Sequence, residues 1–482
     1  MERAKKAQQP QNPSKMQKDR ELLVVSNIFT VLFLAVIAYF VYFQAVKSEE
    51  FINNPYNSLQ DLFAERVVRG PILSADGEVL AVTRTGEDGA ETREYPYGRM
   101  FAHAVGYVGN GKAGIENQEN FSLLRSHEFF LEQILNDISG KKSRGDTVVT
   151  TVNAGIQKCA YEALGSYDGA VIVLEPKTGK IIAMVSKPDY DPNTIAADWE
   201  EVTAEGSTAL YNRATQGKYA PGSVFKIFTT LEYYREHPAS FADYHFNCLG
   251  AFSRGGQTIH CASGRQHGEE DLKASFANSC NASYASLALS LDVERFAGLC
   301  EDMLFNTSLP IAFPSGKSSF RLTREDGEAL LMETAIGQGL TLVSPLHMAL
   351  AAAAIDNAGV LMRPYLTDHT ESASGALVDQ NEPKEYRALM AADEAEFLRE
   401  YLRAVVTDGT AGALDGKNYT AYGKTGTAQV SDTSDRTNAW FVGFAEKEGY
   451  EDIVVAVVLE DAGGGSAYAV PVAKKVFDLY FD

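Results

Sequence analysis

Cysteine is scarce in this chain of 482 residues, which contains only five. So low and odd a count excludes a small disulfide-stapled scaffold, in which paired cysteines compensate for a small hydrophobic core. The length instead predicts two to three domains, each with enough apolar residues to bury a core of its own.

Basic residues are also few: 43 Lys and Arg stand against 64 Asp and Glu, a formal net charge of −21. A nucleic-acid partner requires a basic surface that neutralises phosphates, so the charge argues against that class of function. An acidic surface favours solubility, but it identifies no substrate.

Charge is absent altogether from residues 22–46, which are mainly Val, Leu, Ile, Phe and Ala. About 20 apolar residues cross a bilayer as a helix, so this run predicts a transmembrane anchor. The basic residues that precede it, from Arg3 to Arg20, place residues 1–21 in the cytoplasm and the rest of the chain outside. The alternative is a cleaved signal peptide, whose apolar core is shorter and ends in small residues. This run ends in aromatic residues instead, which favours an uncleaved single-pass anchor in the cell membrane.

Regular periodicity is weak in residues 47–150, which are polar and rich in turns. Short β-prone runs surround the turns at Asp76-Gly77 and at Gly109-Asn110-Gly111. We expect a β-rich spacer, or pedestal, without catalytic residues.

The remainder, residues 151–482, shows strand patterns at both ends and helical patterns between them. The hairpin predicted near its start comprises residues 169–174 and 181–186, and helices are expected to dominate from there to about residue 415, for example 326–337 and 343–356. Three more strands are predicted at residues 418–426, 438–445 and 452–459, before a last helix at 470–480. This order predicts one sheet assembled from both ends of the segment with a helical insert, an α/β or α+β domain.

One short stretch, residues 219–226, has the pattern of an activated serine. Pro221 and Gly222 end the preceding segment, and Ser223 then opens an apolar run that is compatible with a helix. Lys226 follows one turn later on the same face, where a neutral amine could take the serine proton. The alternative for an isolated S-x-x-K is a helix-capping serine beside a surface lysine, so the pattern requires partners.

Two further motifs supply those partners in the expected order. Ser279-Cys280-Asn281 follows a helical run, and Lys424-Thr425-Gly426-Thr427 lies in a strand near the C-terminus. S-x-x-K, S-x-N and K-T-G in this order are the signature of penicillin-binding proteins and serine β-lactamases. The chain also contains a second S-x-x-K at residues 139–142 and a second K-T-G at residues 177–179, but these occupy polar turns and the wrong places in the order.

The chain resembles a class B penicillin-binding protein, a membrane-anchored peptidoglycan D,D-transpeptidase, over nearly its whole length. Beyond the motifs, the resemblance rests on Arg69-Gly70, residues 95–107, Gly114-Ile115-Glu116, Asn212-Arg213-Ala214, Gly337-Gln338-Gly339 with Ser344-Pro345, Gly409-Thr410-Ala411 and Asn438-Ala439-Trp440-Phe441. It implies a transpeptidase fold at residues 151–482, with a central antiparallel sheet flanked by helices and a helical subdomain. It also implies that residues 47–150 form an elongated pedestal of the dimerisation type.

The resemblance also implies a role for each motif residue. Ser223 attacks the carbonyl between two D-alanines of a stem peptide and forms an acyl-enzyme, with Lys226 as the base. Ser279 passes the proton to the leaving amine, and Asn281 holds Lys226 and the substrate amide. Lys424, Thr425 and Thr427 bind the terminal carboxylate. The backbone N–H groups of Ser223 and Thr427 form an oxyanion hole, and Gly426 lets the strand approach closely.

The same resemblance sets the expected partners. These are peptidoglycan stem peptides and β-lactams, which mimic their D-Ala-D-Ala ends. About a hundred residues of spacer cannot hold a glycosyltransferase domain, so a polytopic membrane glycosyltransferase of the SEDS type is expected to polymerise the glycan. No cofactor is implied.

Two other functions stay open at this point. One is hydrolysis, as a D,D-carboxypeptidase or a β-lactamase, although no E-x-x-L-N stretch that would position a deacylating water is found. The other is a non-catalytic scaffold of wall synthesis or a β-lactam sensor. The sequence does not distinguish a role in elongation, division or sporulation.

The remaining cysteines and histidines have no predicted role. Cys280 is expected to be a small buried side chain, and whether Cys248 and Cys261 form a disulfide is left open. Three histidines, His237, His260 and His267, show no ligand spacing, so no metal site is predicted.

Overall fold

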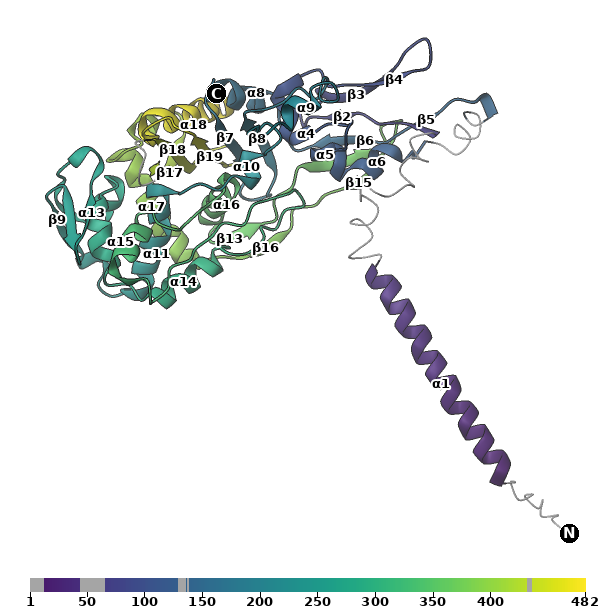
Figure 1. Cartoon of the computed structure of the whole chain (residues 1–482), viewed down its shortest axis with the longest axis horizontal. Helices are drawn as coiled ribbons and strands as arrows, with labels where there is room; N and C mark the ends of the chain where they lie inside the picture. Colours follow the sequence, from purple (N-terminus) through teal and green to yellow (C-terminus); the bar gives the residue numbers. More distant parts are fainter. Residues whose placement is uncertain (1–12, 44–65, 129–135, 137, 431–435) are drawn as a thin grey trace. The chain divides into compact units, whose positions relative to one another are not determined.

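The computed structural model of the chain describes residues 13–43, 66–128, 136, 138–430 and 436–482. It divides into two units, residues 1–59 and residues 60–482. The first unit contains helix α1 (Pro13–Tyr42), labelled in Figure 1. Within the described part of the chain, α1 alone is long and apolar enough to cross a membrane, over Leu22–Tyr42 with a mean hydropathy of 2.4.

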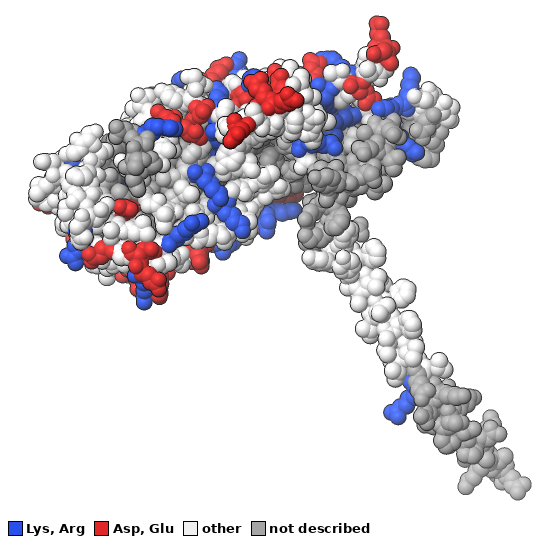
Figure 2. Space-filling model, viewed as in Figure 1, with Lys and Arg blue, Asp and Glu red and all other residues white. Residues whose placement is uncertain are grey.

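The apolar side chains of α1 are exposed along the predicted span, and Figure 2 shows no charged side chain over that part of the helix. An uncharged apolar surface of this length matches the hydrocarbon core of a bilayer. The predicted run extends to Val46, and its last three residues lie outside the described ones, as do residues 1–12 of the predicted cytoplasmic tail.

The second unit is built on a five-stranded antiparallel sheet with the order β17-β18-β19-β7-β8. Its strands are β7 (Gly169–Leu174), β8 (Ile181–Lys187), β17 (Thr420–Gln429), β18 (Thr437–Glu446) and β19 (Ile453–Leu459). Every residue of β7 and β19 is buried, as expected for strands covered on both faces. The predicted sheet formed from both ends of the segment is confirmed.

Helices cover this sheet on both faces. Helix α18 (Gly465–Phe481) packs on β18 and on α8 (Ala154–Leu164), whereas α16 (Pro345–Asp356) packs on β7, β18 and β19. Figure 1 shows α18 on one side of the strands and α16 on the other. Eleven of the twelve residues of α16 are buried, so α16 is a core helix and not an amphipathic surface helix.

The helical insert contains α11 (Lys226–Glu236), α12 (Leu272–Ala277), α13 (Asn281–Ala288), α14 (Val293–Asp302), α15 (Gly327–Ala335) and α17 (Ala392–Thr407). It also contains short strands that the sequence analysis did not predict. Strand β9 (His245–Cys248) pairs with β12 (Gly268–Asp271), and β10 (Ala251–Arg254) pairs with β11 (Gln257–His260). They are too short and too exposed to give an alternating apolar pattern.

Part of the region before residue 150 forms a second sheet, as predicted, with the order β15-β14-β6-β2-β3-β4. The β-prone run predicted just before Gly109 was wrong in part, because helix α4 (Ala102–Val105) occupies its start. Its strands are β2 (Ile72–Leu73), β3 (Val79–Thr85), β4 (Glu91–Glu94), β6 (Thr147–Thr150), β14 (Thr367–Glu371) and β15 (Leu377–Gln380). Strands β14 and β15 therefore join this sheet from the far side of the predicted boundary at residue 150. This pairing ties the spacer to the rest of the second unit.

A buried ion cluster lies between the spacer motifs that the sequence analysis noted. Glu116 is completely buried and accepts from Arg69 Nε at 2.6 Å and from Arg93 Nε at 2.7 Å. Tyr95 also donates to Glu116, at 3.2 Å. A Cβ on Gly70 would lie 1.9 Å from the carbonyl oxygen of Asp146, so only glycine permits this approach of the two backbones.

Candidate active site

The S-x-x-K serine lies at the start of a helix, as predicted. Pro221 caps a 3-10 turn (η3, Gly222–Phe225), which continues directly into α11. Ser223 is partly exposed in this turn, whereas Lys226 is completely buried at the first position of α11. The turn packs against β17, the strand that carries K-T-G.

The S-x-N motif meets Lys226 directly. Lys226 Nζ donates to the carbonyl oxygen of Ser279 and to Asn281 Oδ1, both at 2.8 Å, and lies 3.4 Å from Ser279 Oγ. Ser279 has a φ of +58°, a strained value for a residue with a side chain, in the turn between α12 and α13. This conformation directs both its carbonyl and its hydroxyl toward the lysine.

Lys424, on strand β17, contacts the same hydroxyl. Its Nζ donates to Ser279 Oγ at 2.9 Å and to the carbonyl oxygen of Thr425 at 3.1 Å. Ser279 Oγ is therefore shared by two buried amines from distant parts of the chain. The three motifs predicted to act together are brought together around Ser279.

Burial controls the charge of the two lysines. It lowers the pKa of Lys226 to about 8. It lowers the pKa of Lys424 well below its ordinary value, and the neighbouring charge of Lys226 adds to that effect.

The end of β17 contacts the nucleophile turn through backbone atoms. A Cβ on Gly222, which has a φ of +54°, would lie 2.6 Å from the carbonyl oxygen of Thr427. A Cβ on Gly426 would lie 3.0 Å from the carbonyl oxygen of Pro221. Close approach of the K-T-G strand to Ser223 therefore depends on glycine at both positions.

The two threonines of the K-T-G motif differ in their surroundings. Thr425 is buried and its hydroxyl lies 2.5 Å from that of Thr410, whereas Thr427 is exposed and accepts from the Gly465 N–H at 3.3 Å. Thr410 and Gly465 had no role in the sequence-based hypothesis. In the sequence, Thr410 and Gly465 belong to the stretches Gly409-Thr410-Ala411 and Gly463-Gly464-Gly465. Only the fold shows that both stretches lie against β17.

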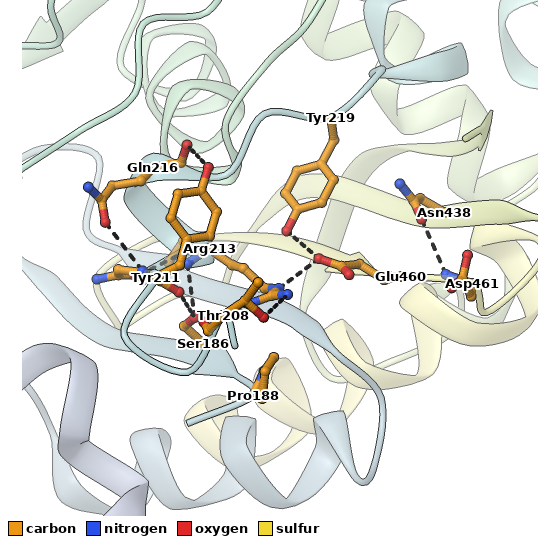
Figure 3. A network of polar contacts seen from close by, with 12 residues as sticks. Ser186, Pro188, Thr208, Tyr211, Arg213, Gln216, Tyr219, Asn438, Glu460 and Asp461 are labelled. Atoms are coloured by element: carbon orange, nitrogen blue, oxygen red, sulfur yellow. Dashed lines mark hydrogen bonds and ion pairs between the residues drawn. The ribbon is translucent and has the colours of Figure 1, made fainter. Parts of the chain in front are cut away.

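The segment before Ser223 is held by a polar network (Figure 3). Arg213 Nε and the Tyr219 hydroxyl each donate to Glu460 Oε1 at 2.7 Å, and Arg213 also donates to the Thr208 hydroxyl at 2.9 Å. Glu460 follows β19 directly, so the network ties the end of the central sheet to the loop that leads into the nucleophile turn. The buried Trp440 indole donates to the carbonyl oxygen of Ala220 at 3.1 Å.

The two decoy motifs lie outside this arrangement. Ser139 donates to the carbonyl oxygen of Asn136, and Lys142 pairs with Glu91 at 2.8 Å. Lys177 of the second K-T-G pairs with Asp452 in the turn between β7 and β8. Neither decoy motif therefore contacts the other motifs through these ion pairs and hydrogen bonds.

Three of the cysteines lie close together, which their spacing in the sequence did not indicate. Cys280 is buried, as expected, but its Sγ lies 3.7 Å from that of Cys261, which lies 3.6 Å from that of Cys248. All five cysteines, each within the described residues, are free. His267 shows no ligand spacing in the sequence, but the fold places its Nδ1 3.3 Å from Cys248 Sγ.

Comparison with known proteins agrees with the motif geometry. The penicillin binding protein transpeptidase domain family matches residues 169–478, and the penicillin binding protein A dimerisation domain family matches residues 69–148. Peptidoglycan D,D-transpeptidase PbpA of Mycolicibacterium smegmatis is 30% identical over 444 residues, which cover 83% of this chain and 87% of that protein. Peptidoglycan D,D-transpeptidase MrdA of Haemophilus influenzae is 28% identical over 458 residues, which cover 81% of this chain and 69% of that protein.

Solved structures show the same fold. The D,D-transpeptidase domain of a peptidoglycan glycosyltransferase from Eggerthella lenta has a TM-score of 0.75 and 30% identity, covering 86% of this chain and 99% of that one. Penicillin-binding protein A of M. tuberculosis, as its ceftriaxone acyl-enzyme, has a TM-score of 0.78 and 25% identity, covering 88% and 100%. The motif order, the geometry around Ser279 and these matches together show that the chain belongs to the penicillin-binding protein transpeptidase family, in its class B form.

Proposed function

We propose that this protein is a peptidoglycan D,D-transpeptidase that forms its acyl-enzyme on Ser223 and is acylated there by β-lactams. The observation that supports this most directly is the convergence of two buried lysines on Ser279 Oγ, next to the turn that carries Ser223. A scaffold has no need for two buried amines, because each costs free energy when charged and unpaired.

Lys226 is proposed to be the base for acylation. A neutral amine has two N–H groups, and both are occupied by the Ser279 carbonyl and Asn281 Oδ1. Its lone pair is then free to accept the Ser223 proton while Oγ attacks the D-Ala-D-Ala carbonyl. Because burial lowers the Lys226 pKa to about 8, the neutral form is accessible near neutral pH.

Lys424, Thr425 and Thr427 are proposed to bind the terminal carboxylate of the stem peptide. A bound carboxylate favours the charged form of Lys424, and that charge in turn favours the neutral form of Lys226. Substrate would thereby prepare the base it requires. The N–H groups of Ser223 and Thr427 are proposed to hold the oxyanion, and the close approach enforced at Gly222 and Gly426 supports this.

Ser279 is proposed to return the proton to the leaving D-alanine amine. Its hydroxyl lies within reach of both lysines, so it can receive a proton from one of them while donating its own. An amine of a neighbouring stem peptide then attacks the acyl-enzyme and forms the cross-link. Asn281 is proposed to orient Lys226 and to contact the substrate amide.

Membrane topology and partners are part of the same proposal. We propose that α1 spans the cell membrane once, with residues 1–21 cytoplasmic and residues 47–482 outside, where residues 47–150 act as the pedestal and residues 151–482 as the catalytic domain. The exposed apolar surface of α1 and the match of residues 69–148 support this arrangement. A polytopic glycosyltransferase of the SEDS type is the proposed partner in glycan synthesis.

The first experiment is the intact mass of the full-length protein after brief exposure to benzylpenicillin. We expect one stable adduct, located on Ser223 by peptide mapping, that is absent from Ser223→Ala and retained by Ser139→Ala, the matched change in the decoy motif. Failure of folded wild-type protein to form an adduct would refute Ser223 as the nucleophile. Adduct formation followed by rapid release of penicilloate would instead identify a β-lactamase.

Transpeptidation is then separated from hydrolysis with a D-Ala-D-Ala stem peptide and an acceptor amine. We expect product that contains the acceptor to increase with acceptor concentration, at the expense of the free acid. If the free acid alone forms, a carboxypeptidase is the correct assignment.

A further inference from the structure

Four side chains that the proposed mechanism does not use come together behind the S-x-N motif. Cys248 ends β9, Cys261 follows β11, His267 precedes β12, and Cys280 caps the N-terminus of α13. All three cysteines are buried and His267 is partly exposed. Their four ligand atoms all lie within 4.8 Å of one another.

The separations fit a tetrahedral metal site. Around zinc, with Zn–S near 2.3 Å and Zn–N near 2.05 Å, neighbouring sulfurs lie about 3.8 Å apart, and a sulfur and a nitrogen about 3.6 Å apart. The corresponding Sγ–Sγ distances are 3.6 Å for Cys248 and Cys261 and 3.7 Å for Cys261 and Cys280, and the Cys248 Sγ–His267 Nδ1 distance is 3.3 Å. A disulfide would bring two sulfurs to about 2.05 Å and leave the third cysteine unpaired.

The surroundings suit a structural metal ion. Ala282 and the rings of Phe246 and Phe252 pack around the cysteines and form an apolar shell. The Ser283 N–H at the start of α13 donates to Cys280 Sγ at 3.4 Å, the kind of bond that stabilises a thiolate ligand. Three sulfurs and one imidazole fill four positions, so the set is closed and leaves no position for substrate.

We infer that Cys248, Cys261, His267 and Cys280 bind one zinc ion in a closed Cys3His site. Three thiol protons leave to solvent as the metal binds, and His267 binds through Nδ1. Soft sulfur ligands in tetrahedral order favour zinc over magnesium, calcium or manganese. The assignment does not rest on the proposed function, because metal content is measured without any reaction.

An ion bound to Cys280 would affect the geometry of the active site. Cys280 lies between Ser279 and Asn281, which both accept hydrogen bonds from Lys226 Nζ. Asn281 also donates through Nδ2 to the carbonyl oxygen of His260, which directly precedes Cys261. A metal ion that binds Cys261 and Cys280 would therefore hold the Ser279–Asn281 turn and the His260 carbonyl in place. The two cysteines would then be positioning residues for Lys226.

The test begins with metal analysis of the full-length protein, purified in detergent without a metal-affinity step. We expect about one zinc per chain, as for a closed four-ligand site. Cys280→Ser and His267→Ala should each lose most of the metal, whereas Cys159→Ser and His260→Ala should keep it. The two control residues are a cysteine remote from the cluster and an exposed histidine beside it.

Cobalt provides a second readout that does not depend on whether the variants fold. Wild-type protein stripped with a chelator and reloaded with Co²⁺ should show the intense thiolate-to-cobalt charge-transfer band of a tetrahedral thiolate site. Removal of the metal should lower the rate of acylation by penicillin about tenfold or more, because displacement of catalytic groups by about 1 Å has effects of that size. Addition of zinc, but not of magnesium, should restore the rate.

Several results would overturn the inference. One is protein that contains no zinc either as isolated or after loading with zinc under reducing conditions. Another is equal zinc content in the ligand variants and the control variants. A third is a cobalt complex without the thiolate-to-cobalt charge-transfer band. A disulfide between any two of the three cysteines, found by peptide mapping of native protein, would also overturn it and would assign the cluster to redox chemistry.

Discussion

A carboxylate placed against Lys226 gives the sharpest test of its role as the base. Asn281→Asp keeps the size and shape of the side chain and puts a negative charge at the position that now lies 2.8 Å from Lys226 Nζ. The charge favours the ammonium form, so the Lys226 pKa should rise from about 8. Asn281→Ala removes the same hydrogen bond without adding charge and is the matched control.

The size of the effect follows from the geometry. Two unit charges 2.8 Å apart attract by about 6 kcal/mol at an effective dielectric of 20, which is an upper bound because the new carboxylate loses solvation. Such a neighbour ordinarily shifts a pKa by about 1–3 units. With a pKa of about 8 roughly one lysine in eleven is neutral at pH 7, so acylation at that pH should fall about tenfold to a thousandfold.

The assay is the second-order rate of acylation by benzylpenicillin between pH 6 and 10, corrected for hydrolysis of the antibiotic. Wild type should rise about tenfold from pH 7 to pH 9 and then level off, as expected for a base with a pKa of about 8. In Asn281→Asp the rise should continue to higher pH, whereas Asn281→Ala should level off no later than wild type. If the Asp variant and wild type level off at the same pH, the proton is taken by another group.

Three further predictions concern other parts of the chain. Gly337→Ala should lower the free energy of unfolding by about 2–5 kcal/mol and slow acylation, because its Cβ would lie 2.0 Å from the carbonyl oxygen of Gly222. Gly375→Ala, with a similar φ but open surroundings, should lower the free energy of unfolding by only about 1 kcal/mol. Both variants are measured by thermal denaturation and by the rate of acylation. Glu116→Gln should lower the free energy of unfolding by about 3–5 kcal/mol, because it leaves two buried arginines without a counter-charge. Burial raises the pKa of Glu116, but the two arginines outweigh burial and lower that pKa overall. The stabilising contribution of the Glu116 charge is therefore complete above about pH 4.5 and is lost as the pH falls through the lowered pKa. Wild type should lose this stability in acid, whereas Glu116→Gln should not. Leu32→Lys should lower the fraction of protein in the membrane, since a charge at mid-span costs about 2.5–3.5 kcal/mol, and an unchanged fraction would refute α1 as the anchor.

Much of the fold could be predicted because its strands carry strong local patterns. The runs that became β7 and β19 are continuous and largely β-branched, and a buried strand with that pattern has few alternatives. The short strands β9 to β12 could not be predicted, because four-residue exposed strands depend on partners rather than on their own pattern.

Some residues of the candidate site could be identified from the sequence, and others only from the structure. The motif residues Ser223, Ser279 and Lys424 are defined by order and spacing, so the sequence was sufficient to select them. The group formed by Cys248, Cys261, His267 and Cys280 was missed, because its members lie too far apart for the short spacing that marks most zinc sites. Thr410 was not assigned a role either, since only tertiary packing brings its hydroxyl to Thr425.

The central sheet has a consequence for biogenesis. Strand β7 is synthesised well before its partner β19, and the two pair along the whole length of β7, from Gly169 with Leu459 to Leu174 with Val454. Pairing of such distant segments is slow, and until it occurs β7 presents an unpaired apolar edge prone to aggregation. Because Lys424 lies in the same downstream segment, the nascent chain lacks the complete set of three motifs until that segment has been synthesised.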